Sequence, residues 1–125
     1  MDQISFSKNW NNKLNSEYFT SIRPPHSKYT PGNILKVVCT EEWRYNAMIQ
    51  HRKEIMLKDL TDYDTLIDAG MCRLDFICWM KSTYPTYDFA EKPIIKVLLR
   101  QLDTKHPAAL PPTPATIFIP MKQYP

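Results

Sequence analysis

Residues 61–85 read TDYDTLIDAGMCRLDFICWMKSTYP and predict the helical part of the fold. Thr61 followed by Asp64 is typical of a capping box at a helix start, and Gly70 is typical of a helix end. A short first helix is therefore predicted from Thr61 to Gly70. A second is predicted over Met71–Thr83, ending before a Tyr-Pro pair. This second helix is apolar almost all round, so we expect it to be buried.

Strand patterns flank the helix pair on both sides. Between Arg44 and His51 polar and apolar residues alternate, as in a half-buried strand, and Ile94–Leu102 alternates in the same way. Ile34–Cys39 is an almost continuous β-branched run that favours a buried strand. Further strands are predicted at Ile4–Phe6, Phe19–Arg23 and Glu54–Leu57, and a short helix over Lys8–Asn15. Strands interrupted by a helix pair indicate an α+β fold, here a small β-barrel closed by the last strand.

The length and composition predict one folded domain with a different C-terminal segment. The 125 residues, of which 43% are hydrophobic and 23% charged, are enough for one domain with its own core. We place this domain at residues 1–103. Residues 104–125, TKHPAALPPTPATIFIPMKQYP, form a Pro-rich tail that favours an extended structure. Its apolar residues predict that it packs on its own domain or on a neighbouring subunit.

Charge and cysteine content exclude several classes of protein. The net charge of +3 is too small for a polycationic binder, so any contact with phosphate is local and sensitive to salt. Cys39, Cys72 and Cys78 form no CxxC pair, and the histidines lack zinc-site spacing. We therefore expect no metal or cofactor, and three buried free thiols. No membrane span or signal peptide is predicted, which favours a cytoplasmic protein.

Three short motifs follow one another in the chain. Thr20–Arg23 reads T-S-I-R, Tyr29–Asn33 reads Y-T-P-G-N, and Gly70–Pro85 contains G-x3-L-D-x3-W-x4-Y-P. In this order they resemble the ASCH domain, a branch of the PUA-like β-barrels, over residues 4–102. The resemblance implies a small PUA-like (ASCH-type) barrel with a helix pair and a short N-terminal helix. It also implies RNA or a modified nucleoside as the ligand.

One small bacterial branch of this family deacetylates N4-acetylcytidine with a Lys, a Thr three residues later and a Glu on the second helix. By the resemblance, Ser21 stands at the position of the nucleophilic Thr, Tyr18 at that of the Lys, and Asp75 at that of the Glu. A tyrosine with an ordinary pKa of about 10 is a poor general base at neutral pH. Asp75 is also one methylene shorter than Glu. An amidohydrolase stays open, but we expect little or no hydrolysis.

The resemblance also implies a binding cleft between the barrel and the helix pair. Arg23, Lys28 and Tyr29 are expected beside it, because a base can stack on an aromatic ring while cations meet phosphate. Tyr29 packed into its turn is the structural alternative. We expect Ser21, Arg23 and Asp75 to face one another across this cleft.

Three functional hypotheses follow from the sequence. The leading one is a module that binds RNA or a modified nucleoside, and the second is an amidohydrolase acting on a modified base. The third is an interaction protein that docks or self-associates through the Pro-rich tail. Whether the domain without its tail stays monomeric and soluble separates the third hypothesis from the others.

Overall fold

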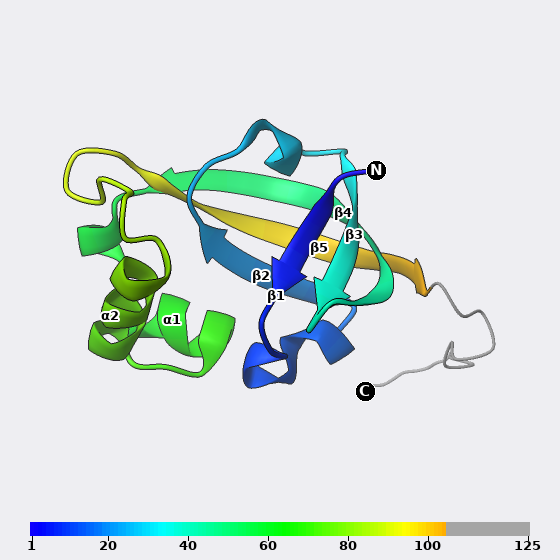
Figure 1. Ribbon diagram of the computed structural model, residues 1–125, viewed down its shortest axis with the longest axis horizontal. Coiled ribbons are helices and arrows are strands. Elements are labelled where there is room, and N and C mark those ends of the chain that lie inside the picture. Colours follow the sequence, from blue (N-terminus) through cyan, green and yellow to red (C-terminus); the bar gives the residue numbers. More distant parts are fainter. Residues whose placement is uncertain (105–125) are drawn as a thin grey trace.

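The computed structural model describes residues 1–104, with side chains to residue 102, as a mixed α+β fold (Figure 1). The α+β class is therefore confirmed. The elements are β1 (Gln3–Phe6), the 3-10 helix η1 (Trp10–Asn15), β2 (Tyr18–Arg23), η2 (Ser27–Tyr29), β3 (Ile34–Cys39), β4 (Glu42–Ile55), η3 (Leu57–Asp59), α1 (Asp62–Ala69), α2 (Arg73–Thr83) and β5 (Ile94–Thr104). Of the predicted tail, only Thr104 belongs to the described residues, so its role and the domain boundary stay predictions.

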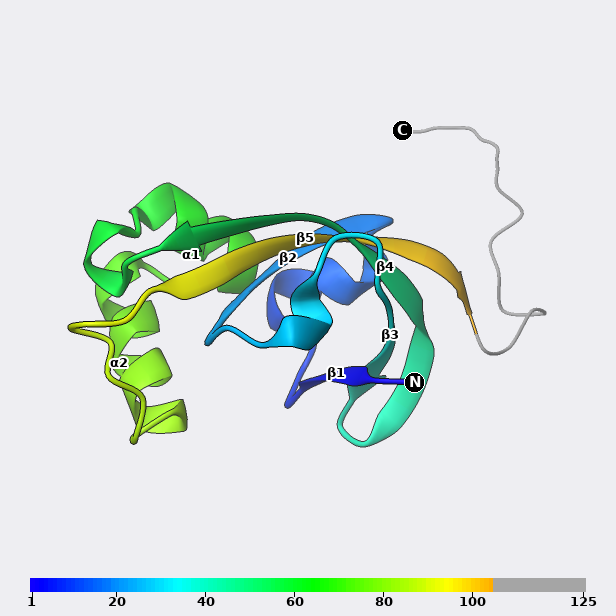
Figure 2. The same ribbon diagram turned by 90° about the horizontal axis from the view of Figure 1, so that it is seen from above.

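The five strands form one sheet in the order β1-β3-β4-β5-β2, in which only β1 and β3 are parallel neighbours. Figures 1 and 2 show this sheet curling into a half-barrel, with α1 and α2 grouped at one end of it. The expected closure by the last strand does not occur, because β5 lies inside the sheet between β4 and β2. β1 and β2 are instead the two edges of the half-barrel.

The alternating patterns give the correct inner face of the long strands. Tyr45, Ala47 and Ile49 of β4 are buried, as are Val97 and Leu99 of β5. The separate strand predicted at Glu54–Leu57 was wrong. β4 runs without interruption to Ile55, and two register shifts against β5 let this long strand bend with the sheet.

The two helices differ in how well the sequence predicts them. Thr61 and Asp64 form the reciprocal capping box, and Gly70 ends α1 in the left-handed conformation with φ 71°. The expected burial of the second helix was wrong: Leu74 is 68% exposed, and only Phe76 and Met80 of α2 are buried. A helix at the end of a sheet buries one stripe of residues, whatever its other faces carry.

The burial of the cysteines also differs between the sheet and the second helix. Cys39 lies in the core on β3, but Cys72 and Cys78 are exposed beside and on α2. The prediction of three buried thiols is therefore wrong for the two cysteines near the second helix.

Two apolar cores meet near the N-terminal 3-10 helix. The first fills the curl of the sheet and contains Phe6, Phe19 and Val97, among others. The second lies under the helices and contains Ile22, Phe76 and others. Trp10 of η1 packs against both cores. The space beside this tryptophan is where the candidate site lies.

Candidate functional site

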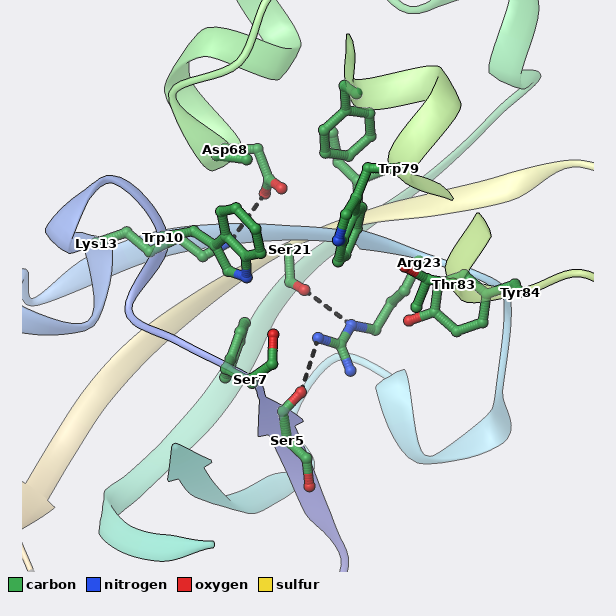
Figure 3. Close-up of a pocket in the computed structure, with 14 residues that line it drawn as sticks. Ser5, Ser7, Trp10, Lys13, Ser21, Arg23, Asp68, Trp79, Thr83 and Tyr84 are labelled. Carbon is green, nitrogen blue, oxygen red and sulfur yellow. Dashed lines mark hydrogen bonds and ion pairs between the residues drawn. The ribbon is translucent and has the colours of Figure 1, made fainter. Parts of the chain in front are cut away.

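A cavity of about 140 Å³ lies where the two cores meet, between the curl of the sheet and the helix pair (Figure 3). We call it the pocket. Its lining comes from β1 and the turn after it, η1, β2 and both helices. The lining residues are Ser5, Phe6, Ser7, Trp10, Lys13, Ser21, Ile22, Arg23, Asp68, Ala69, Phe76, Trp79, Thr83 and Tyr84.

A buried ion pair forms one side of the pocket. Lys13 of η1 and Asp68 of α1 are 8% and 4% exposed, and their Nζ and Oδ1 atoms lie 3.2 Å apart. The Thr20 hydroxyl of β2 donates to the same oxygen at 2.9 Å. The consecutive elements η1 and β2 are thus joined to α1 at one carboxylate, which lies 55 and 48 residues further along the chain than Lys13 and Thr20.

Burial shifts the protonation equilibria of both members of this pair. It lowers the pKa of the Lys13 amine, and the attraction of Asp68 offsets part of the shift. It raises the pKa of the Asp68 carboxyl, against the opposing effects of Lys13 and Thr20. Because burial acts against the charge on both groups, a proton passes between them at lower cost than between the same groups in water.

The turn that carries Lys13 is held against the end of α1. Asn11 and Asn12 adopt positive φ of 56° and 54°, which asparagine tolerates better than most residues, so the expected N-terminal helix is a kinked 3-10 segment. The Asn11 amide donates to the carbonyl oxygens of Leu66 and Ile67 at 3.2 and 3.1 Å. Both carbonyls belong to the last turn of α1; that of Leu66 also accepts from the Gly70 N–H at 2.9 Å. This contact places Lys13 beside Asp68.

A second polar group occupies the opposite side of the pocket. The Ser21 hydroxyl, on a residue that is 2% exposed, accepts a hydrogen bond from Arg23 Nε at 2.8 Å. Arg23 also donates to the Tyr29 hydroxyl at 3.2 Å and to the Ser5 carbonyl at 3.3 Å. The guanidinium lies 5.0 Å from the centroid of the Phe6 ring. Within residues 1–102 it forms no ion pair, although its charge attracts the Asp68 carboxylate, and it places a positive charge at the rim.

Aromatic rings form the helix side of the pocket. Trp10 and Trp79 meet edge to face, with ring centroids 5.3 Å apart and planes at 64°. Phe76 lies next to Trp79 at 5.8 Å. Figure 3 shows the two indoles on one side of Ser21, with Ser5 and Ser7 on the β1 side. The two indoles form a corner, not two parallel walls, so a flat ligand stacks on one indole and meets the other with its edge.

The carboxylate that lines the pocket is not the one that the sequence predicted. Asp75 is exposed on α2 and does not line the pocket, whereas Ser21 and Arg23 meet there as expected. The expected convergence is therefore wrong for Asp75, because α2 turns Phe76 and Trp79 inward instead. The carboxylate in the pocket is Asp68 of α1.

The three other predicted site residues, Tyr18, Tyr29 and Lys28, do not line the pocket. Tyr18 is 50% exposed and does not line the pocket, because a residue three positions before Ser21 projects to the other face of the strand. Tyr29 is only 4% exposed, so a base cannot stack on its ring, and its hydroxyl holds Arg23. The structural alternative for Tyr29 is therefore the one observed. Lys28 lies beside the pocket, and its Nζ donates to the Gln3 carbonyl at 2.8 Å.

Sequence reasoning missed Lys13, Asp68 and both indoles as parts of one site. A signal for Asp68 exists, because Thr65, Asp68 and Ala69 share one helical face, and a charged residue on an otherwise buried face requires a partner. Lys13 carries no comparable signal. Its partner lies 55 residues away, in an element that only the tertiary fold brings near.

Comparisons with protein-family models, curated proteins and solved structures found no match to this chain. In the part of the chain that the structure describes, no cluster of three or more His, Cys, Asp or Glu side chains could hold a metal ion. The same residues include no helix with the length and apolar character needed to cross a membrane. The geometry of the pocket is therefore the basis for assigning a function.

The buried pair leads to a stability prediction. Lys13→Met should lower the free energy of unfolding by about 3–5 kcal/mol, because Asp68 then stays buried without its cation. Lys13→Met combined with Asp68→Leu should be more stable than Lys13→Met alone, since no uncompensated charge is left. Urea denaturation of both variants and the wild type measures this. A double variant with the summed loss of the two single variants would contradict the pairing.

Proposed function

We propose that the pocket binds one pyrimidine-sized base, carried by an RNA or by a modified nucleoside. The observation that carries this proposal is a one-ring cavity with an aromatic corner on one side and an unpaired arginine at its rim. Aromatic stacking combined with hydrogen bonds to the base edge is how proteins recognise unstacked bases.

The size of the pocket favours a single ring. Sites for drug-sized ligands have volumes of roughly 300–1,000 Å³, well above the 140 Å³ of this pocket. A cavity of about 150 Å³ holds one benzene molecule. A six-membered heterocycle therefore fits, and a purine needs more room.

The polar groups suit the edge of a pyrimidine. The Arg23 guanidinium can donate to a carbonyl oxygen of the base. The Ser21 hydroxyl already accepts from Arg23 and has its own proton to donate to the base. On the other side, Asp68 supplies an acceptor for an exocyclic amine. Donors and acceptors thus flank an apolar centre. These features, with the curled sheet and the order of the three motifs, also support a PUA-like, ASCH-type fold as the structural part of the proposal.

Pyrimidine binding should depend on the indole corner. Cytidine should bind more tightly than adenosine. Trp79→Ala should weaken the binding of cytidine by about 1–3 kcal/mol, the usual value of one base–aromatic stack. Isothermal titration calorimetry gives both results. Trp43→Ala is the matched control, because Trp43 is the tryptophan that does not line the pocket. Equal losses in the two variants, or tighter binding of adenosine, would count against the site.

A second candidate function is hydrolysis of an acylated base, and one specific observation favours it. Tyr18 lacks a suitable position to act as a base, but the Lys13 amine lies in the pocket with a lowered pKa. In an amidohydrolase of this design, Lys13 first passes its proton to Asp68. Ser21 Oγ then attacks the acyl carbon, and the Ser21 proton passes to the neutral Lys13 amine. The amine then protonates the leaving exocyclic nitrogen, and water hydrolyses the acyl-serine.

Acetate release from N4-acetylcytidine separates catalysis from binding. A binding module releases no acetate, and this is the result we expect. Multiple turnovers that are abolished by Ser21→Ala, with the variant still folded by circular dichroism, would establish the hydrolase instead. Loss of turnover in Lys13→Met as well, with that variant also still folded by circular dichroism, would assign the base.

A further inference from the structure

A second depression opens beside the pocket and leads away from it, between the turn after β2 and the turn after α2. Its volume is about 480 Å³, and its lining residues come from segments 23–29 and 83–87. We call it the groove. Arg23, Thr83 and Tyr84 line both the pocket and the groove, and Figure 3 shows them together at the pocket rim. The two depressions therefore adjoin at these three residues.

Basic side chains along the first wall bond only to neutral acceptors. Besides the contacts of Arg23, Lys28 donates to the Gln3 carbonyl at 2.8 Å. Arg52 does not line the groove itself, but it donates to the carbonyl of the lining residue His26 at 3.1 Å. Among the described residues, none of these three cations forms an ion pair, and no Asp or Glu lines the groove. Positive charge next to the pocket thus meets no carboxylate within the groove, which favours an anionic ligand there.

The second wall of the groove is aromatic, and acidic side chains lie near the end of this wall that is farther from the pocket. Tyr84 and Tyr87 are partly exposed and offer ring surface to the groove. Burial, and then the nearby charges of Asp88 and Glu54, raise the pKa of Tyr87. An anionic group is therefore favoured at the end near Lys28, next to the pocket, and disfavoured beyond Tyr87.

We infer that a single-stranded nucleic acid binds with one base in the pocket and with the adjoining part of its chain in the groove. The phosphate next to that base lies against Arg23 and Lys28, and the neighbouring base stacks on Tyr84. A base that enters the pocket has left its own stack, so the strand is single at this point. This inference rests on the proposed function of the pocket, and it favours a polynucleotide over a free nucleoside.

Salt dependence tests the phosphate contacts. The oligoribonucleotide tetracytidylate should bind at least tenfold more tightly than cytidine at low salt. Its log affinity should fall against log salt with a slope of about −1.4, because each phosphate contact on a single strand contributes about −0.7. Cytidine, which has no phosphate, should show almost no slope. Calorimetric titrations of the whole chain at several salt concentrations measure both slopes.

A pair of lysine variants tests the location. Lys28 and Lys36 are both half-buried, and each holds its Nζ over an aromatic ring, at 5.2 Å from Tyr29 and 5.0 Å from Trp43. Lys36 lies outside the groove. Lys28→Gln should weaken the binding of tetracytidylate at least fivefold and reduce the slope of its log affinity against log salt to about −0.7. The same change should affect the binding of cytidine far less. Lys36→Gln should leave both ligands unchanged.

The outcomes separate the groove from the pocket. Cytidine binding with no gain for tetracytidylate would overturn the groove and leave the pocket proposal standing. No binding of either ligand would overturn both. A larger loss from Lys36→Gln than from Lys28→Gln would place the strand on another surface, and equal binding of tetra-aspartate would assign the groove to acidic peptides.

Discussion

The buried contact of Lys13 and Thr20 with the Asp68 carboxylate is the interaction on which the pocket depends. It joins η1, β2 and α1 at the place where the two cores meet. Burying two charges is costly, so such a pair adds little net stability over apolar residues of the same size. Its value here is positional, because it fixes the helix pair against the edge of the half-barrel and leaves a polar wall facing the cavity.

Arg23 has the corresponding role at the open side of the sheet. The half-barrel ends at β1 and β2, and the Arg23 guanidinium extends from one edge strand to the Ser5 carbonyl on the other. It is also anchored by Ser21 and Tyr29. A side chain held by so many contacts presents its charge in a fixed position, which lowers the entropic cost of binding a ligand. The pocket and the groove share this one cation.

Local patterns predicted local structure well, and they failed where tertiary packing decides. The capping box at Thr61, the stop at Gly70 and the alternation of β4 and β5 are properties of neighbouring residues, and all were found. The prediction that Asp75 lies in the cleft was wrong because apolar neighbours in the sequence do not by themselves bury a carboxylate. Most of α2 faces outward. The buried pair of Lys13 and Asp68 could not be predicted in this way, since only the curled tertiary structure brings these two residues together. Ser21 and Arg23 were found together because they are two residues apart on one strand.

The indole signals of the three tryptophans test the central claim, a base-binding pocket, most directly. In a two-dimensional ¹H–¹⁵N spectrum each indole N–H gives one peak, and Trp10 and Trp79 line the pocket whereas Trp43 does not. Titration with cytidine should move the Trp10 and Trp79 peaks together along one saturation curve and leave Trp43 in place. Movement of Trp43 alone, or no movement of any indole at millimolar cytidine, would contradict the claim.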